Sequence, residues 1–215
     1  MNAEYFYNLY GSLEDMQIII PFKPRNPKSR LSNILNEKER ENLAFYMLLD
    51  VIDVCEDAII LSSEECKRLE GYRVIVDKRS LDEAVTSFIK KGETAVVMSD
   101  LPLINKKILT SFLDSEGDVV IAPGRKAGTN MLLSRNRDFY TSYHYGSFLK
   151  HIDICRRLGL SYTVFDSFYS SVDIDEKEDL LELMIHGKGK KSYEYLKSLG
   201  FYVDFSEKDP KLRRA

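Results

Sequence analysis

The chain has 215 residues, of which 44% are hydrophobic and 30% charged, a composition typical of a water-soluble globular protein. Lys and Arg total 31 and Asp and Glu 34, giving a net charge of −3, which argues against a nucleic-acid-binding surface. No apolar run is long enough to span a membrane, and the first fifteen residues lack the pattern of a secretion signal. Cys55, Cys66 and Cys155 form no C-x-x-C pair, so we expect reduced thiols and a cytoplasmic location.

Short apolar runs recur along the chain and are continuous rather than alternating, which is typical of strands buried on both faces of a parallel sheet. These runs are 17–22, 58–61, 73–76, 95–98, 118–121 and 162–165. Segments with helical periodicity lie between them, at 36–55, at 80–92 and after Asn105. This alternation predicts βαβ units and a three-layer α/β/α, Rossmann-like domain with a mostly parallel sheet.

The later elements depart from strict alternation. We expect an extra strand at 129–134, helices at 146–158, at 175–185 and from 191 to a left-handed cap at Gly200, and a short strand at 201–205. The single domain is predicted to span 16–205, with an N-terminal extension at 1–15 and a charged tail at 206–215.

A basic segment follows the first predicted strand. In a parallel sheet, ligands bind beyond the carboxyl ends of the strands. Residues 21–31 contain four cations and three prolines, a composition also typical of a solvated basic loop. Its place directly after a buried strand favours a site for a polyanion.

Two other parts of the chain contribute candidate carboxylates to this end of the sheet. Asp100 comes directly after the fourth run, where a carboxylate must be paired, bound to metal or used as a turn cap. Asp173 and Asp175 are two residues apart, and lie on one side of the chain if it is extended. Because Mg²⁺ takes one or two carboxylates together with phosphate oxygens, these three residues are candidate magnesium ligands. For Asp175 the alternative is the N-cap of the helix that follows.

Glycine and hydroxyl residues mark a second candidate anion site. Backbone amides and Thr129, in the segment 122–130, are suited to binding a small anion. Gly146 and Ser147 open a helix whose N-terminal amides suit a phosphate or a carboxylate. The segment 187–192 lacks the spacing of a Walker A loop, and the absence of a G-x-S-x-G or G-x-G-x-x-G motif argues against hydrolases and dinucleotide oxidoreductases.

Taken together and in this order, these segments resemble the 2-phospho-L-lactate guanylyltransferase family. The matching segments are 21–23, 27–31, 99–102, 120–123, 128–130, 146–148, 173–175 and 178–180. They span about residues 17 to 187, nearly the whole predicted domain.

The resemblance implies a GT-A type nucleotidyltransferase (nucleotide-diphospho-sugar transferase fold) that is a homodimer and uses Mg²⁺. It would join GTP and 2-phospho-L-lactate, or a similar phosphorylated three-carbon acid, in the biosynthesis of coenzyme F420, and release pyrophosphate. The implied residues are Lys23, Lys28 and Arg30 for the triphosphate, Pro21, Asp77, Leu81, Asp82 and Ser99 for the rest of the nucleotide, Asp100, Asp173 and Asp175 for the metal, and Thr129, Gly146 and Ser147 for the acid.

Two departures from the family pattern concern the nucleotide. Asp82 stands where the family would have Asn, and prolines in the first loop replace the glycine pair of the wider superfamily. The choice of base is therefore less closely determined than the fold. The sequence also leaves open 2-phospholactate, phosphoenolpyruvate and 3-phosphoglycerate as the acid, since each carries one phosphate and one carboxylate.

The chemistry of the residues agrees with this assignment. The attacking phosphate oxygen is already ionised at neutral pH, so no general base is needed. Positioning and charge neutralisation are needed instead. The alternatives are a molybdenum cofactor guanylyltransferase, a sugar-nucleotide pyrophosphorylase, a glycosyltransferase using Asp173 and Asp175 as its D-x-D motif, and a regulatory module without activity. The basic loop argues against the glycosyltransferase, because a sugar nucleotide has no triphosphate.

Overall fold

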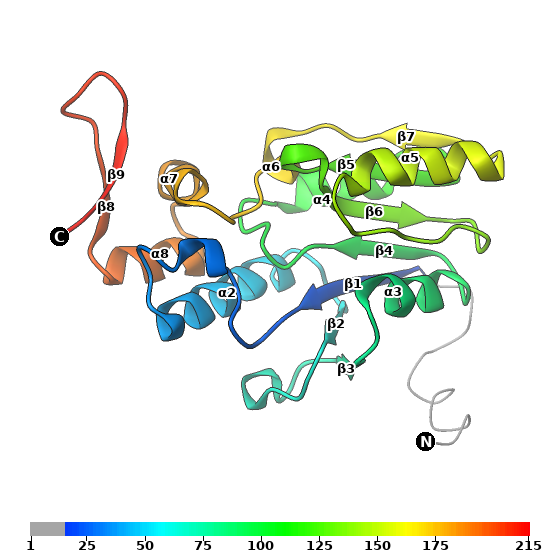
Figure 1. The fold of residues 1–215 in the computed structure, drawn as a ribbon, viewed down its shortest axis with the longest axis horizontal. Helices are drawn as coiled ribbons and strands as arrows, with labels where there is room; N and C mark the ends of the chain where they lie inside the picture. Colours follow the sequence, from blue (N-terminus) through cyan, green and yellow to red (C-terminus); the bar gives the residue numbers. More distant parts are fainter. Residues whose placement is uncertain (1–15) are drawn as a thin grey trace.

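Seven strands form one sheet in the order β3-β2-β1-β4-β6-β5-β7 in the computed structural model, which describes residues 16–215 (Figure 1). The strands are β1 (Gln17–Phe22), β2 (Ile59–Ser62), β3 (Val74–Val76), β4 (Thr94–Val97), β5 (Val119–Pro123), β6 (Thr129–Ser134) and β7 (Tyr162–Val164). Only β6 runs antiparallel to its neighbours. The mostly parallel sheet is thus confirmed, and the predicted extension at 1–15 lies outside the described residues.

Helices cover both faces of the sheet, as the three-layer prediction requires. One face packs against α2 (Glu37–Ile52), α4 (Lys106–Leu113), α7 (Lys177–His186) and α8 (Lys191–Ser198). The other face packs against α3 (Leu81–Ile89) and α5 (Ser147–Leu158), which crosses in front of β5 in Figure 1. The remaining helical elements are a short helix, α6 (Phe168–Ser171), and 3-10 turns at Ser29–Leu31, Lys67–Leu69 and Arg125–Ala127.

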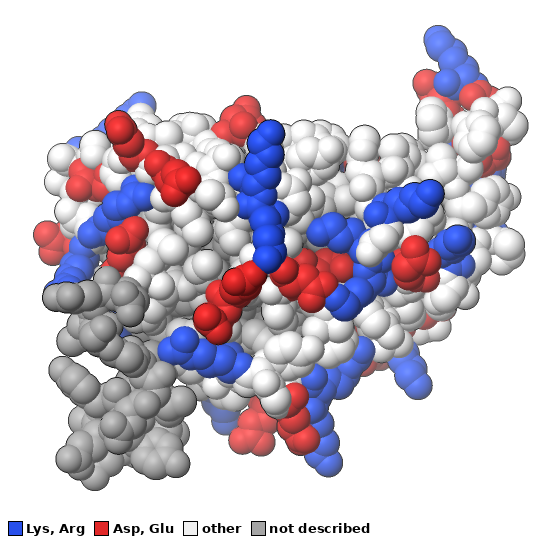
Figure 2. Space-filling view, turned by 180° about the vertical axis from the view of Figure 1, so that it is seen from behind, with Lys and Arg blue, Asp and Glu red and all other residues white. Residues whose placement is uncertain are grey.

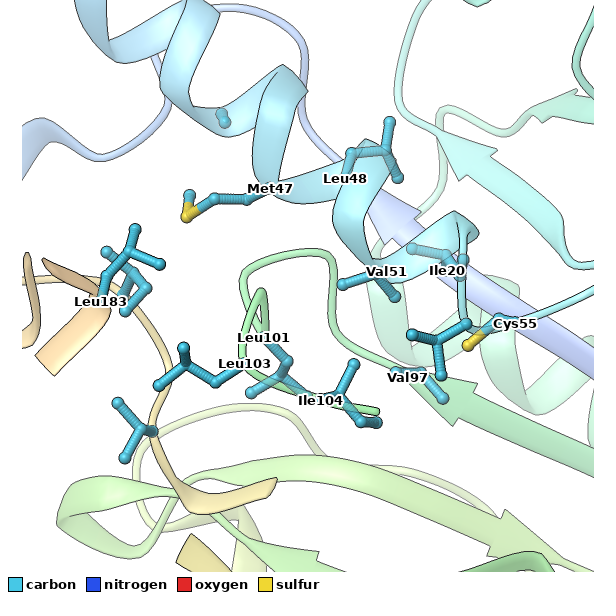
Figure 3. Packing of buried hydrophobic residues seen from close by; sticks show 14 of the residues in the cluster. Ile20, Met47, Leu48, Val51, Cys55, Val97, Leu101, Leu103, Ile104 and Leu183 are labelled. Atoms are coloured by element: carbon cyan, nitrogen blue, oxygen red, sulfur yellow. The ribbon is translucent and has the colours of Figure 1, made fainter. Parts of the chain in front are cut away.

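Consecutive residues of the central strands enter opposite cores, because side chains alternate along a strand. Val96 lies in the core beneath α3 and α5, whereas Val97 lies in the core beneath α2, and both are fully buried. Figure 3 shows Val97 near Val51 of α2 and near Cys55, which follows that helix. Burial on both faces explains why the runs are continuous.

The caps of the helices agree with the sequence, with one exception. Asn36 caps α2 in a capping box with Glu39, as predicted. The expected cap of α7 at Asp175 is wrong: Glu176 is the N-cap, in a capping box with Asp179. Because Asp179 accepts the Asp175 and Glu176 amides, the carboxylate of Asp175 is free to make contacts elsewhere.

The chain closes with a hairpin of β8 (Phe201–Asp204) and β9 (Lys211–Arg214), which projects from one end of the molecule (Figure 1). Gly200 has φ of +86°, in agreement with the predicted left-handed cap. The sequence predicts no strand in 206–215, yet β9 lies there and its Arg214 pairs with Glu39 at the start of α2. Within residues 16–215, no helix combines the length and apolarity that a bilayer span requires.

Candidate active site

Two carboxylates from distant parts of the chain meet one lysine at the carboxyl end of the sheet. The Nζ of Lys28 donates to Asp100 Oδ2 at 2.5 Å and to Asp175 Oδ1 at 2.7 Å. Arg30 adds a contact of 3.3 Å to Asp175. Burial opposes the charged ammonium but the two carboxylates favour it, and the net effect raises the pKa of Lys28. The predicted basic loop and acidic residues therefore converge.

The core holds Asp100 at this position. Leu101, Leu103 and Ile104 follow it directly and are buried beside α2 and α7 (Figure 3). The backbone carbonyl of Asp100 accepts the amide of Ile174 at 3.1 Å. This bond places the segment 173–175 beside the end of β4.

Asp173 lies in an acidic, partly desolvated environment. Burial raises the pKa of its carboxyl, and the neighbouring charge of Asp100 raises it further, although Asn130 Nδ2 donates to it at 3.2 Å. In contrast, the pKa of Asp175 is lowered: burial acts against its ionised form, but Lys28 outweighs that effect. The protein thus does not fully compensate the negative charge near Asp100 and Asp173. A cation bound there would make the ionised form of Asp173 more favourable.

These carboxylates fit a divalent cation that keeps most of its waters. Among residues 16–215, no group of three or more His, Cys, Asp or Glu side chains is arranged as a preformed metal site. Mg²⁺ does not need such a group, because it commonly takes one or two carboxylates and completes its shell with water and phosphate. The charges of Asp100 and, to a smaller extent, Asp175 both act on Asp173.

A cleft of about 460 Å³ opens beside Asp100 at the ends of β1 and β2, a volume that suits a small-molecule ligand. Met47 and Leu61 contribute apolar walls. The predicted nucleotide-site residues that line it are Pro21, Lys23, Lys28, Asp77, Leu81, Ser99 and Asp100. We call it the nucleotide cleft.

Asp82 does not line this cleft. Its Oδ1 accepts the amide of Tyr143 at 2.7 Å, on the side of the sheet covered by α5. Arg79, which the sequence analysis did not single out, lines the cleft and donates to both oxygens of Asp77, with Nη2 at 2.6 Å from Oδ2. Its hydrogen bonds lower the pKa of Asp77.

A second cleft, of about 590 Å³, lies on the other side of Asp175. Gly146 and Ser147, the residues predicted to bind the acid, line it, and Arg30 lines it rather than the nucleotide cleft. Gly146 adopts a φ of +70° before α5, which a residue with a Cβ adopts only with strain. Arg125 and Lys126 also line this cleft, although no sequence motif marks them individually. We call it the acid cleft.

Thr129 lies behind the acid cleft rather than on its wall. Its Oγ1 is 3.1 Å from Ser147 Oγ, which donates to it, and 3.0 Å from Nδ1 of His151. His151 Nε2 accepts the amide of Ser142 at 2.9 Å, and burial lowers the pKa of the imidazole to about 4. A neutral histidine therefore supports the hydroxyls, a role that sequence spacing did not indicate.

Lys28, Asp100 and Asp175 line the nucleotide cleft, while Asp173 and Asp175 line the acid cleft. Asp175 thus borders both. On the face shown in Figure 2, basic and acidic side chains are interspersed without a broad basic patch. Both clefts are lined by carboxylates as well as by cations.

Comparison with known proteins supports the same chemistry. The family described as "Guanylyl transferase CofC like" matches residues 16–215. The 2-phospho-L-lactate guanylyltransferase of Ferroglobus placidus is 66% identical over 93% of this chain and 100% of its own length. The enzyme of the same name from Archaeoglobus fulgidus is 54% identical over 93% of this chain and 97% of its own. The chain belongs to the CofC guanylyltransferase family.

Solved structures at low identity support the fold of this guanylyltransferase. A protein from Desulfovibrio desulfuricans, described as a nucleotide-diphospho-sugar transferase, aligns with a TM-score of 0.73 at 16% identity, covering 86% of this chain and 95% of that one. A nucleotidyl transferase from Methanothermobacter aligns with a TM-score of 0.56 at 12% identity, covering 85% and 98%. The predicted family, fold type and nucleotidyltransferase class are confirmed.

Proposed function

We propose that the chain joins GTP and 2-phospho-L-lactate, or a similar phosphorylated three-carbon acid, to give lactyl-2-diphospho-5'-guanosine and pyrophosphate in the biosynthesis of coenzyme F420. The observation that carries this proposal is the meeting of two cation-bordered clefts at Asp175. A reaction between two anions needs such an arrangement, because each must approach the other with its charge neutralised.

GTP would occupy the nucleotide cleft. Lys23 and Lys28 line it beside Asp100. Lys28 donates to Asp100 and Asp175, and the third N–H of its ammonium is left for the triphosphate. Leu61, Leu81 and Ala84 line the same cleft and offer apolar contact to a nucleoside. Asp77 and Arg79 provide the polar groups near that end.

The phosphorylated acid would occupy the acid cleft. The first amides of α5 offer hydrogen-bond donors to an anion, and the helix dipole favours it. The Ser147 hydroxyl, which has one hydrogen and donates it to Thr129, would turn to the anion when the acid binds. Arg30, Arg125 and Lys126 supply positive charge around this position. Arg125 pairs with Asp179, and Lys126 with Glu176 at 2.5 Å, so these ion pairs hold the cations at the rim.

Asp100 and Asp173 would hold Mg²⁺, with Asp175 beside them. Bound there, the ion supplies charge neutralisation at the phosphates. The structural support is the raised pKa of Asp173 next to Asp100, which indicates that the protein alone does not fully compensate the charge of the Asp173 carboxylate.

The residues of the site provide no general base, and the reaction does not require one. An oxygen of the acid's phosphate, already ionised at neutral pH, forms a bond to the α-phosphorus of GTP. The bond from that phosphorus to the bridging oxygen breaks, and pyrophosphate leaves with the electron pair. Lys28 is placed to stabilise the charge that develops on the leaving group.

A pyrophosphate-release screen tests the proposal. It crosses the four nucleoside triphosphates with 2-phospho-L-lactate, phosphoenolpyruvate and 3-phosphoglycerate in the presence of Mg²⁺. We expect release with GTP and one or more of the acids. Release of a nucleoside diphosphate from a sugar nucleotide instead would support the glycosyltransferase alternative, and no turnover with any acid would contradict the proposal.

We also propose a cytoplasmic homodimer. The cytoplasmic location rests on Cys55, Cys66 and Cys155, which form no disulfide among the described residues. The dimer rests on the family resemblance alone. Sedimentation velocity on the purified protein tests it directly.

A further inference from the structure

A buried arginine lies behind the basic loop. Arg40, in the first turns of α2, is 7% exposed. Its guanidinium donates to the carbonyl of Pro27 at 3.2 Å, to the carbonyl of Leu35 at 3.1 Å and to Asn26 Oδ1 at 2.9 Å. All three acceptors are neutral. Within residues 16–215, none of the ion pairs involves Arg40.

Such a position is costly for a cation. Burying a charge without a counter-charge is unfavourable, and a positive group near the N-terminus of a helix opposes the helix dipole. Packing alone does not require a guanidinium here, because an apolar side chain fills buried space without this cost. The contacts of Arg40 therefore need another explanation, and all of them lie in the segment that leads into and out of the basic loop.

The loop that Arg40 holds has an unfavourable backbone. Asn26 has φ of +44° and Lys28 has φ of +52°, a left-handed region that residues with a Cβ adopt rarely. Pro27 lies between them. Arg40 binds the side chain of Asn26 and the carbonyl of Pro27, so it contacts the first left-handed residue and the peptide group that leads into the second. Strained backbone of this kind persists where its surroundings fix it.

The strained backbone determines where Lys28 lies. Pro27 and Lys28 form part of the wall of the nucleotide cleft, which Arg40 does not line. The Nζ of Lys28 reaches Asp100 and Asp175 from this backbone. A loop free to leave the left-handed conformation would spread Lys28 over many positions, and nucleotide binding would then have to order it.

We propose that Arg40 is a positioning residue, which holds the loop 26–28 in its left-handed conformation and so presets Lys28 for the triphosphate. The inference rests on the proposed function, because it assigns the triphosphate to the nucleotide cleft. Arg40 acts through Pro27 and Lys28 and touches no reactant.

Arg135 provides a matched control. Its guanidinium donates to the carbonyls of Leu113 and Gly117, each at 2.8 Å, and pairs with Glu93. Arg135 follows β6, which runs antiparallel to its neighbours. It therefore lies at the amino ends of the parallel strands, opposite the clefts. Arg40→Lys and Arg135→Lys each keep the positive charge but remove the planar guanidinium that donates to backbone carbonyls.

The experiment measures binding of a non-hydrolysable GTP analogue by calorimetry in Mg²⁺, the KM values of both substrates, and the Tm. We expect Arg40→Lys to weaken analogue binding and raise the KM of GTP by about tenfold, since preorganisation is lost, with the KM of the acid changed little. Arg135→Lys is expected to lower only the Tm. Analogue binding unchanged in Arg40→Lys, or weakened equally in both variants, would overturn the inference.

A second pair of variants decides the point if Arg40→Lys fails to fold. Asn26→Ala and Asn26→Gly both remove the side-chain oxygen that accepts a hydrogen bond from Arg40. Only alanine keeps a Cβ at a φ of +44°. We expect Asn26→Gly to retain more affinity for the analogue than Asn26→Ala. Equal affinities would count against the proposed role. Because the experiment measures binding of the GTP analogue, it decides the role of Arg40 even if the acid substrate proposed above is wrong.

Discussion

The Nζ of Lys28 lies 2.5 Å from Oδ2 of Asp100, although 72 residues separate them in the chain. The ammonium also borders the nucleotide cleft. Lys28 therefore has two sets of anionic partners: the carboxylates that it already contacts, and the triphosphate that we propose. Its removal should affect stability and nucleotide binding together.

Lys28→Ala should raise the KM of GTP far more than that of the acid. It should also lower the free energy of unfolding by about 2 kcal/mol, because Asp100 and Asp175 lose their partner in a partly buried site. Steady-state kinetics and urea unfolding measure the two effects. Lys107→Ala, an exposed lysine on α4, is the control. Equal increases in both KM values would contradict the assignment of the nucleotide cleft.

Ser147→Ala should raise the KM of the acid by about tenfold, the effect of losing one hydrogen bond to a charged group, and leave the KM of GTP unchanged. Ser147 lines only the acid cleft of the two. Kinetics with each substrate varied in turn test this. Ser198→Ala, which removes an exposed hydroxyl bound to Tyr195, serves as the matched control. An effect on GTP alone would exchange the two clefts.

Much of the fold could be predicted because its signals are local. Val96 and Val97 belong to a continuous apolar run, and they are buried in opposite cores. The convergence of Lys28 with Asp100 followed from a general rule, since the carboxyl ends of parallel strands share one edge. Neither prediction needed the orientation of a particular side chain.

Side-chain direction on helices was harder to predict. Leu81 and Asp82 are neighbours in sequence, yet successive residues of a helix point about 100° apart. Leu81 lines the nucleotide cleft, whereas Asp82 binds the amide of Tyr143. The cap of α7 differs by one residue for a related reason, because Asp175 and Glu176 are both acidic and tertiary contacts to Lys28 decide between them.

The strand β9 could not be predicted, because its residues carry no apolar periodicity. Lys211, Arg213 and Arg214 leave only Leu212 to be buried. The strand forms by pairing with β8, and Arg214 anchors it to α2. Such a strand depends on contacts distant in sequence, which local patterns do not contain.

Asp173→Asn should stabilise the protein in metal-free buffer at pH 7.5 and lower its activity. The pKa of Asp173 is raised in the folded state, so ionisation of this carboxyl opposes folding above its ordinary pKa. The gain should diminish as the pH falls and the wild-type carboxyl becomes protonated. Urea unfolding in chelator at several pH values measures this.

The control for Asp173 is a carboxylate with the opposite behaviour. Ser161 lowers the pKa of Asp118 by donating to it, so Asp118→Asn should not stabilise the protein. If Asp173→Asn lowers the urea midpoint at neutral pH, the proposed acidic cluster is not a source of instability. A cation would then have less to compensate, and the case for Asp173 as a ligand would weaken.

His151→Gln should make the stability of the protein less dependent on pH between 4 and 6.5. Burial lowers the pKa of His151 from 6.5 to about 4. The unfolded chain therefore binds a proton here at a pH where the native protein does not, and native stability falls as the pH drops through this range. The slope approaches about 1.4 kcal/mol per pH unit, for a total of about 3 kcal/mol.

Urea unfolding of the wild type and of His151→Gln at pH 7.5, 6 and 5 measures this contribution. The variant should be less stable at pH 7.5, because Thr129 and the amide of Ser142 lose their partner, and the gap should narrow on acidification. The other titrating groups are common to both proteins, so their contributions cancel in the difference. His144→Gln, at a mostly exposed imidazole, is the control. A gap that stays constant from pH 7.5 to 5 would show that His151 has the same pKa in the native and unfolded states. Burial would then not be what keeps the imidazole beside Thr129 neutral.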